Sequence, residues 1–270
     1  MSRSTEHSWA QANSAKEVAA ALLETGEYGP ALETARDAVA LARDAGFIPL
    51  LVAALVVLGR ACRTLVLLEE ARTTQLEAAR LNDDLKSPLY AEAIATELCA
   101  VEATAGRWAA AHDCARQALA ARTYRTAYPG LTRWYETEAL ARAGELELAR
   151  ADLLSFAGQP GFSPRARLQY LRGLAALAAH TGDLDEARRN LREARRLARR
   201  IRLPGELWEI CATLGALDRA AGDERAARRS LAQATEILQA LATSIEDEAL
   251  RAALLSATPA HQGLVYQPLA

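Results

Sequence analysis

The chain has 270 residues, of which 51% are hydrophobic and only 5% are aromatic, and its formal net charge is −2. This composition supplies enough apolar surface for a sizeable core, while the small net charge argues against a general attraction to nucleic acid or to an acidic membrane. The longest apolar run, Ile48 to Gly59, is too short to span a bilayer, and the first residues lack the basic-then-apolar order of a signal peptide. We therefore expect a cytoplasmic protein with no membrane segment.

Alanines at a regular spacing divide the chain into six repeats. Successive alanines are 38 or 40 residues apart, and a glycine precedes five of the six by five residues, with Val66 in that place in the second repeat. A period of this length is typical of stacked supersecondary units. It predicts one continuous domain over residues 1–256, in which each repeat contacts mainly its neighbours, followed by a tail at 257–270. The repeat alanines are Ala31, Ala71, Ala111, Ala149, Ala187 and Ala227.

Each repeat predicts two helices. In the fifth repeat, Ser163 and Pro164 supply an N-cap and a first-turn proline, and Gly182 supplies the left-handed end of the first helix. Leucines recur at helical spacing in both halves, and alternating β-branched patterns are almost absent, so the fold class is all-α. Irregular segments at 122–130 and 157–164 flank the fourth repeat, which predicts shorter or reoriented helices there.

The residues twelve positions before the repeat alanines are small, and leucine precedes them in four of the six repeats. This pattern resembles the tetratricopeptide repeat (TPR), although the period here exceeds that family's usual length of about 34 residues. The resemblance implies a right-handed α-solenoid of about six TPR-like helix hairpins, with a C-terminal capping helix near 246–256. The fourth repeat departs from the pattern, with Glu136 and Thr137 at these two positions.

The long period and the closing segment 227–257 also resemble the C-terminal sensor arrays of STAND-class bacterial signalling ATPases, the class that includes the maltose-regulon transcription activator. The chain contains no G-x-x-x-x-G-K-[ST] motif, so nothing in it resembles the nucleotide-binding part of those regulators. The resemblance therefore implies a sensor module for signal transduction. Binding in its groove would shift a closed array towards an open one and release a partner ATPase domain to oligomerise.

In TPR arrays the first helix of each hairpin lines a concave groove, and the resemblance implies which side chains face it here. Arginine forks pair with carboxylate or phosphate, and tryptophan offers a stacking surface. We expect a peptide with acidic residues, or a small anionic or sugar-like effector, unless these arginines are solvated or pair with neighbouring glutamates. The candidate ligand-binding residues are Arg60, Arg63, Trp134, Glu138, Arg142, Arg172, His180 and Arg219, with Glu24 and Glu209 at equivalent positions.

No motif for catalysis or metal binding stands out. The four cysteines form no C-x-x-C pair, no two histidines share a metal-binding spacing, and there is no nucleophile elbow. We expect no enzymatic activity, no metal and no cofactor, and buried cysteines in a reducing compartment. The arginine-rich segment 185–202 predicts a solvated outer helix face, or a docking surface for a partner domain, rather than a nucleic-acid site.

Two other functions compatible with the repeat remain open. One is a free-standing TPR scaffold for protein–protein interaction. The other is a structural homo-oligomer assembled through its end helices, because end repeats without a polar cap tend to associate. A native gene with no ATPase region upstream of this chain would favour the scaffold over the sensor module.

Overall fold

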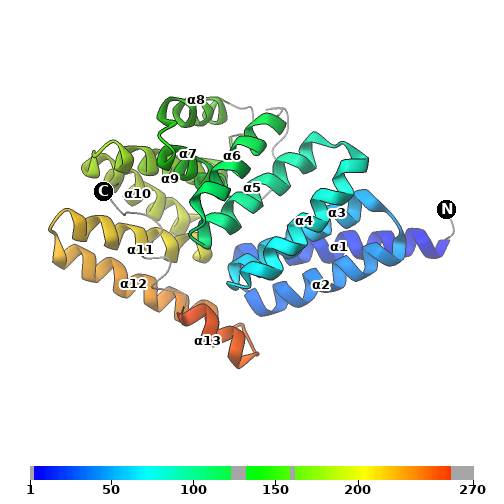
Figure 1. Ribbon diagram of the computed structural model, residues 1–270. Coiled ribbons are helices and arrows are strands. Elements are labelled where there is room, and N and C mark those ends of the chain that lie inside the picture. Colours follow the sequence, from blue (N-terminus) through cyan, green and yellow to red (C-terminus); the bar gives the residue numbers. More distant parts are fainter. Residues whose placement is uncertain (1–2, 123–131, 159–161, 257–270) are drawn as a thin grey trace.

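The computed structural model describes residues 3–122, 132–158 and 162–256. Within these ranges the chain forms thirteen α-helices and no strand (Figure 1). The helices are α1 (Arg3–Thr25), α2 (Tyr28–Ala45), α3 (Ile48–Thr64), α4 (Leu68–Leu85), α5 (Pro88–Thr104), α6 (Trp108–Ala121), α7 (Trp134–Arg142), α8 (Leu146–Ala157), α9 (Pro164–His180), α10 (Leu184–Arg200), α11 (Pro204–Ala220), α12 (Glu224–Ala242) and α13 (Glu248–Ser256). The predicted tail at 257–270 and most of the irregular segment 122–130 lie outside the described residues.

Consecutive helices pair as six hairpins, from α1 with α2 to α11 with α12, and α13 follows as the predicted capping helix. All six repeat alanines are fully buried in the second helices of their hairpins. A methyl group at these positions lets the two backbones approach closely while it still contributes apolar area. The predicted all-α array of stacked TPR-like hairpins is thus confirmed. None of the described helices is long and apolar enough to cross a membrane.

The turn inside each hairpin needs a left-handed residue, which explains the repeated glycine. Gly26, Gly106, Gly144, Gly182 and Gly222 all have φ between 74° and 90°. Val66 takes the same conformation in the second hairpin, at φ 63°. A β-branched residue is strained there, since its Cβ crowds the following carbonyl group. The second repeat therefore keeps the shape of the turn without its glycine.

The fourth hairpin is short, as predicted: α7 has 9 residues and α8 has 12, against 17 in each helix of the fifth hairpin. A buried charge cluster lies at its junction with the third hairpin. The Arg122 guanidinium has no exposed surface and pairs with Glu92 of α5, Glu136 of α7 and Asp152 of α8. One arginine thereby links three helices where the apolar stripe of the repeat is interrupted.

The array closes on itself, and its first hairpin meets its last one (Figure 1). The Tyr28 backbone N–H donates to Ser244 Oγ at 2.9 Å, and the Ser244 hydroxyl donates to the Gly26 carbonyl at 3.3 Å. One apolar core extends from α1–α5 to Trp208 of α11 and Leu238 of α12. We call the contact of residues 26–29 with residues 241–245 the seam. The sequence did not predict this contact.

Candidate ligand-binding site

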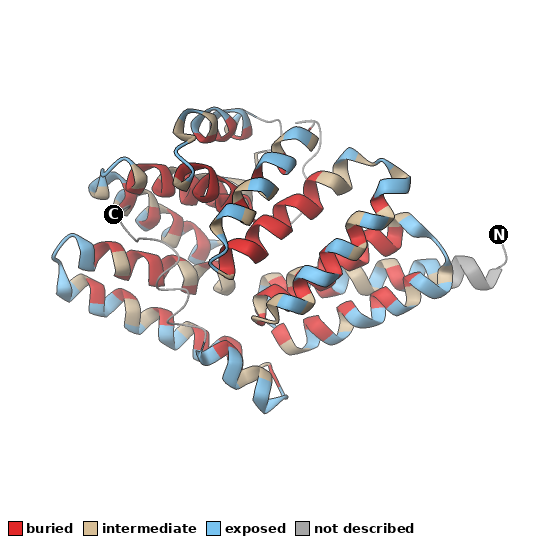
Figure 2. Cartoon of the chain, viewed as in Figure 1, coloured by how far each residue is buried: buried red, intermediate tan, exposed pale blue. Residues whose placement is uncertain are grey.

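The first helices of the six hairpins, α1, α3, α5, α7, α9 and α11, form the inner layer of the closed array. From α1 to α9 each contacts its neighbour in this layer, α9 pairs with α11 through Arg172, and α1 contacts α11. Most of α3, α5 and α7 is buried, whereas α2 and α12 expose one face (Figure 2). Despite this burial, the inner layer is rich in charge, and its buried charged residues include Arg63, Glu92, Glu97, Glu102, Glu136, Glu138, Arg172, Glu206 and Asp218.

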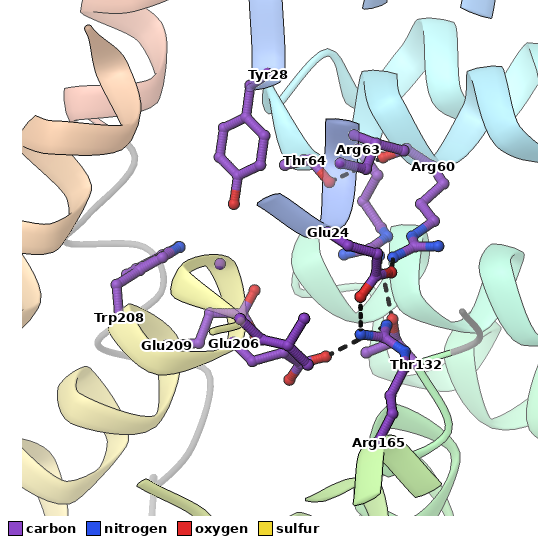
Figure 3. A pocket seen from close by; sticks show the side chains of 13 residues that line it. Glu24, Tyr28, Arg60, Arg63, Thr64, Thr132, Arg165, Glu206, Trp208 and Glu209 are labelled. Atoms are coloured by element: carbon purple, nitrogen blue, oxygen red, sulfur yellow. Dashed lines mark hydrogen bonds and ion pairs between the residues drawn. The ribbon is translucent and has the colours of Figure 1, made fainter. Parts of the chain in front are cut away.

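A cavity lies where the ends of the array meet, among α1, α3, α9 and α11 (Figure 3). Its volume is about 600 Å³, which includes space open to solvent. We call it the seam pocket. Tyr28 and Trp208 form part of its wall, and its charged lining residues are Glu24, Arg60, Arg63, Arg165, Glu206 and Glu209.

Glu24 connects three helices across the seam pocket. One of its carboxylate oxygens pairs with Arg60 of α3 and the other with Arg165 of α9. Arg165 also lies 3.6 Å from the carboxylate of Glu206 on α11 (Figure 3). The first hairpin is therefore tied by charge to the fifth and sixth hairpins, in addition to its apolar contacts at the seam.

Glu206 and Glu209 share the guanidinium of Arg172. Arg172 pairs with Glu206 through Nη1 and with Glu209 through Nη2, the latter at 2.7 Å. Gln169 donates to Glu206 at 2.7 Å. Burial alone would raise the pKa of Glu206, but Arg172 and Arg165 lower it by more, so that this pKa lies below its ordinary value of 4.5. The carboxylate is therefore ionised at neutral pH.

Arg63 sits one helical turn from Arg60 on α3. Its Nε donates to Glu97 at 3.3 Å, and its Nη2 donates to the Thr132 hydroxyl at a long 3.5 Å. Burial would lower the pKa of Arg63, but Glu97 and other neighbours raise it above its ordinary value, so the guanidinium stays charged. Burial raises the pKa of Tyr28 beyond its ordinary range, so its phenol stays neutral.

A second polar cluster lies between α7 and α9. Glu138 is fully buried, and its Oε1 pairs with Arg142 at 2.7 Å and with His180 Nε2 at 3.1 Å. Arg142 stacks over the Trp108 ring, 4.1 Å from its centroid. Glu138 Oε2 has no hydrogen-bond partner in the described part of the chain. Through these contacts the cluster joins the third, fourth and fifth hairpins.

The eight predicted site residues separate into four groups. Arg60 and Arg63 line the seam pocket. Trp134 and Arg172 line a second, smaller cavity, with the Arg172 guanidinium 4.1 Å from the Trp134 ring centroid. Three form the packed cluster of Glu138, Arg142 and His180. Arg219 is exposed, 4.0 Å from Glu224. Glutamate pairing, the alternative considered for the arginines, holds for Arg60, Arg63, Arg142 and Arg172.

Sequence reasoning missed Tyr28, Arg165 and Glu206, which reach the pocket because the array closes. A signal for part of this network was present in the sequence. Arg63 and Glu97, and likewise Arg172 and Glu206, are 34 residues apart. The outer pairs Arg36–Glu70 and Arg43–Glu77 have the same separation. A separation of 34 residues equals one repeat period minus about one helical turn. An arginine and a glutamate at this separation therefore mark a contact between neighbouring hairpins.

The described residues offer no obvious catalytic chemistry. No group of three or more His, Cys, Asp or Glu side chains among them could hold a metal ion. Burial raises the pKa of the Cys62 thiol to about 12 and that of Cys114 to about 11, and it also raises those of Cys99 and Cys211. A thiol protonated at neutral pH is a poor nucleophile.

Neither a protein-family model nor a curated protein matches the chain. Two solved structures are similar to it in fold. BtubC (BKLC) from P. vanneervenii is 19% identical, with 89% of this chain and 93% of that chain covered and a TM-score of 0.46. A tetratricopeptide repeat protein from Parabacteroides merdae ATCC 43184 is 17% identical, with 92% and 99% covered and a TM-score of 0.45. These similarities leave the ligand and the predicted link to STAND-class regulators untested.

Proposed function

We propose that this protein is a non-catalytic binding module in which the occupancy of the seam pocket sets whether the array is closed or open. The observation that carries the proposal is that three charged side chains have two roles at once. Glu24, Arg165 and Glu206 line the pocket and also tie the first hairpin to the last two. A ligand that pairs with one of these charged groups weakens the ion pairs between the hairpins. Such a ligand binds the open array better than the closed one.

The size of the cavity suits a small molecule or the end of a peptide. Its volume of about 600 Å³ includes space open to solvent, so the enclosed part has room only for a small group, such as the charged end of a ligand. A ligand that binds the open form about tenfold more tightly shifts the equilibrium by about 1.4 kcal/mol. Such a shift changes the populations of two forms substantially when their free energies are close.

We further propose that the module is the sensor part of a bacterial STAND-type ATPase or transcriptional regulator of the cytoplasm. The repeat length and the closing segment support this context by resemblance. In it, the opened array would release a partner ATPase domain. An antibody against the array would detect the native polypeptide by immunoblot: a mass well above 29.1 kDa, with an ATPase region in the same polypeptide, supports the sensor. A mass equal to that of the array alone favours the free-standing scaffold.

The switching proposal is tested by removing the Arg165 ion pairs and measuring the distance between the ends of the array. Spin labels at Glu33 on α2 and Gln239 on α12, both exposed, report the distance across the seam. In Arg165→Gln, Glu24 and Glu206 face each other without the cation between them, so we expect the distance distribution to move to longer values. Arg167→Gln is the matched control, because Arg167 lies on the same helix but pairs on the outside with Glu193. Identical distributions in both variants and the wild type would contradict the proposal.

A further inference from the structure

We infer that the seam pocket binds a small zwitterion, a molecule with both a carboxylate and an ammonium group and the size of a free amino acid or a dipeptide. This inference rests on the proposed function only in placing the ligand in the same pocket. It differs from the anionic or sugar-like ligand predicted from the sequence, and the reason lies in the charges of the pocket wall.

The wall of the pocket carries no net charge. Three arginines and three glutamates line it, and the adjoining Arg172 and Glu97 add one charge of each sign. In a partly buried site, a ligand with one net charge leaves that charge uncompensated, which is less favourable than leaving it in water. A zwitterion keeps the sum at zero and still offers a strong partner to each sign.

The side chains with spare hydrogen-bonding capacity lie on facing walls. Among the described residues, Arg60 pairs only through Nη2, with Glu24, so its Nε and Nη1 remain able to donate. Arg63 spends its Nη2 on the long contact to Thr132. Figure 3 shows both arginines on the α3 side of the pocket. Two guanidinium groups one turn apart on a helix suit a carboxylate, which accepts bidentate hydrogen bonds.

The opposite wall provides the acceptor. Glu209 uses Oε2 to pair with Arg172, and its Oε1 accepts no hydrogen bond from the described residues. Its side chain is 19% exposed and lies across the pocket from Arg60 and Arg63 (Figure 3). Glu24 and Glu206, by contrast, already use both carboxylate oxygens. We therefore assign Glu209 as the group that accepts the ligand's ammonium.

An apolar surface next to Glu209 can receive the ligand's side chain. Tyr28 and Trp208 lie on this side of the pocket in Figure 3, and Leu23 and Leu203 also line the pocket. A ring or an aliphatic group would pack there without disturbing the two charged contacts.

The experiment is isothermal titration calorimetry of the whole chain with free L-amino acids and dipeptides, each compared with its N-acetylated and its C-amidated form. We expect at least one aromatic or aliphatic zwitterion to bind, and each derivative of it to bind at least about tenfold more weakly, because each loses one charge-assisted hydrogen bond. Equal or tighter binding of either derivative overturns the inference. So does the absence of binding by every member of the panel at millimolar concentration.

One variant assigns the ammonium contact. Glu209→Gln keeps the shape of the side chain, and Arg172 keeps its pair with Glu206, so the fold is expected to persist; circular dichroism checks this. In this variant the preference for the free over the N-acetylated ligand should shrink to less than about threefold. Glu236→Gln, at an exposed position on α12, should leave the preference unchanged. A full preference in Glu209→Gln overturns the assignment.

The spin-label distances separate this inference from the proposed switch. A zwitterion that binds without changing the distance across the seam supports the ligand class and contradicts the switch. A simple anion that binds and changes the distance does the opposite.

Discussion

The seam depends on a glycine that allows two backbones to meet, so a single methyl group should open it. Gly29 is the second residue of α2, and a Cβ added there would lie 2.3 Å from the carbonyl oxygen of Ser244. Since ordinary contacts begin near 3.4 Å, the backbone at Ser244, just after α12, must retreat by about 1 Å. That movement strains the hydrogen bonds of Ser244 with Tyr28 and Gly26.

The expected cost of Gly29→Ala follows from three terms. Overpacking costs about 1–3 kcal/mol, and the two weakened hydrogen bonds cost about 1 kcal/mol between them. Alanine stabilises the helix by up to about 1 kcal/mol relative to glycine, because its helix propensity is higher. The net loss of about 2 kcal/mol should lower Tm by about 4 °C for a chain of this size. It should also increase the radius of gyration in small-angle X-ray scattering, because the strain is relieved by separating the ends of the array.

Gly158→Ala is the matched control for this measurement. A Cβ at Gly158 meets its nearest neighbours at 3.6 and 3.7 Å, which are ordinary contacts. We expect its Tm and radius of gyration to equal those of the wild type. A Gly29→Ala protein with the radius and Tm of the control would refute the close backbone contact at the seam and the closed array with it.

Three further predictions concern backbone strain, buried charge and pH. Lys86→Gly should raise the free energy of unfolding by about 0.5–1 kcal/mol in urea denaturation, because Lys86 is exposed and held at φ 51°; Lys86→Ala keeps the strain and should show no gain. Arg122→Met should cost about 3–5 kcal/mol in urea denaturation by removing the cation that pairs with three buried carboxylates, whereas the exposed Arg116→Met should have little effect. The lowered pKa of Glu206 means that its contribution to stability is complete above its ordinary value of 4.5 and is lost as the pH falls through the lower folded-state value. Acid denaturation of Glu206→Gln should therefore be less steep than that of the wild type, and an unchanged profile would contradict this assignment.

The fold was predictable from the sequence where it depends on local, repeated signals. A buried alanine such as Ala187 and a left-handed glycine such as Gly182 serve the same purpose in almost every hairpin, so their spacing reveals the architecture. Even Val66, which breaks the rule, occupies the same turn geometry, and the Leu67 N–H donates to the Cys62 carbonyl at 2.9 Å there, as in the glycine turns.

The site was only partly predictable, because it arises from closure. Tyr28 and Ser244 are 216 residues apart, and their contact depends on small rotations that accumulate over six hairpins. Arg60 and Arg63 were found because they face inwards within their own hairpin. Arg165 lies in the first turn of α9 and gains its role only when the first hairpin comes round to meet it. Reading each repeat separately cannot reveal such a residue.

In the proposed switch, the apolar and the charged contacts between the ends of the array contribute differently to the cost of opening. The apolar core shared by the first helices with Trp208 and Leu238 opposes opening by about 25 cal/mol per Å² of buried area. Buried ion pairs behave differently, because the cost of removing charges from water offsets most of their attraction. When the array opens, Glu24, Arg165 and Glu206 exchange each other for water with little net change. The apolar contacts would then set the cost of opening, and a small ligand can shift the equilibrium only when that cost is a few kcal/mol.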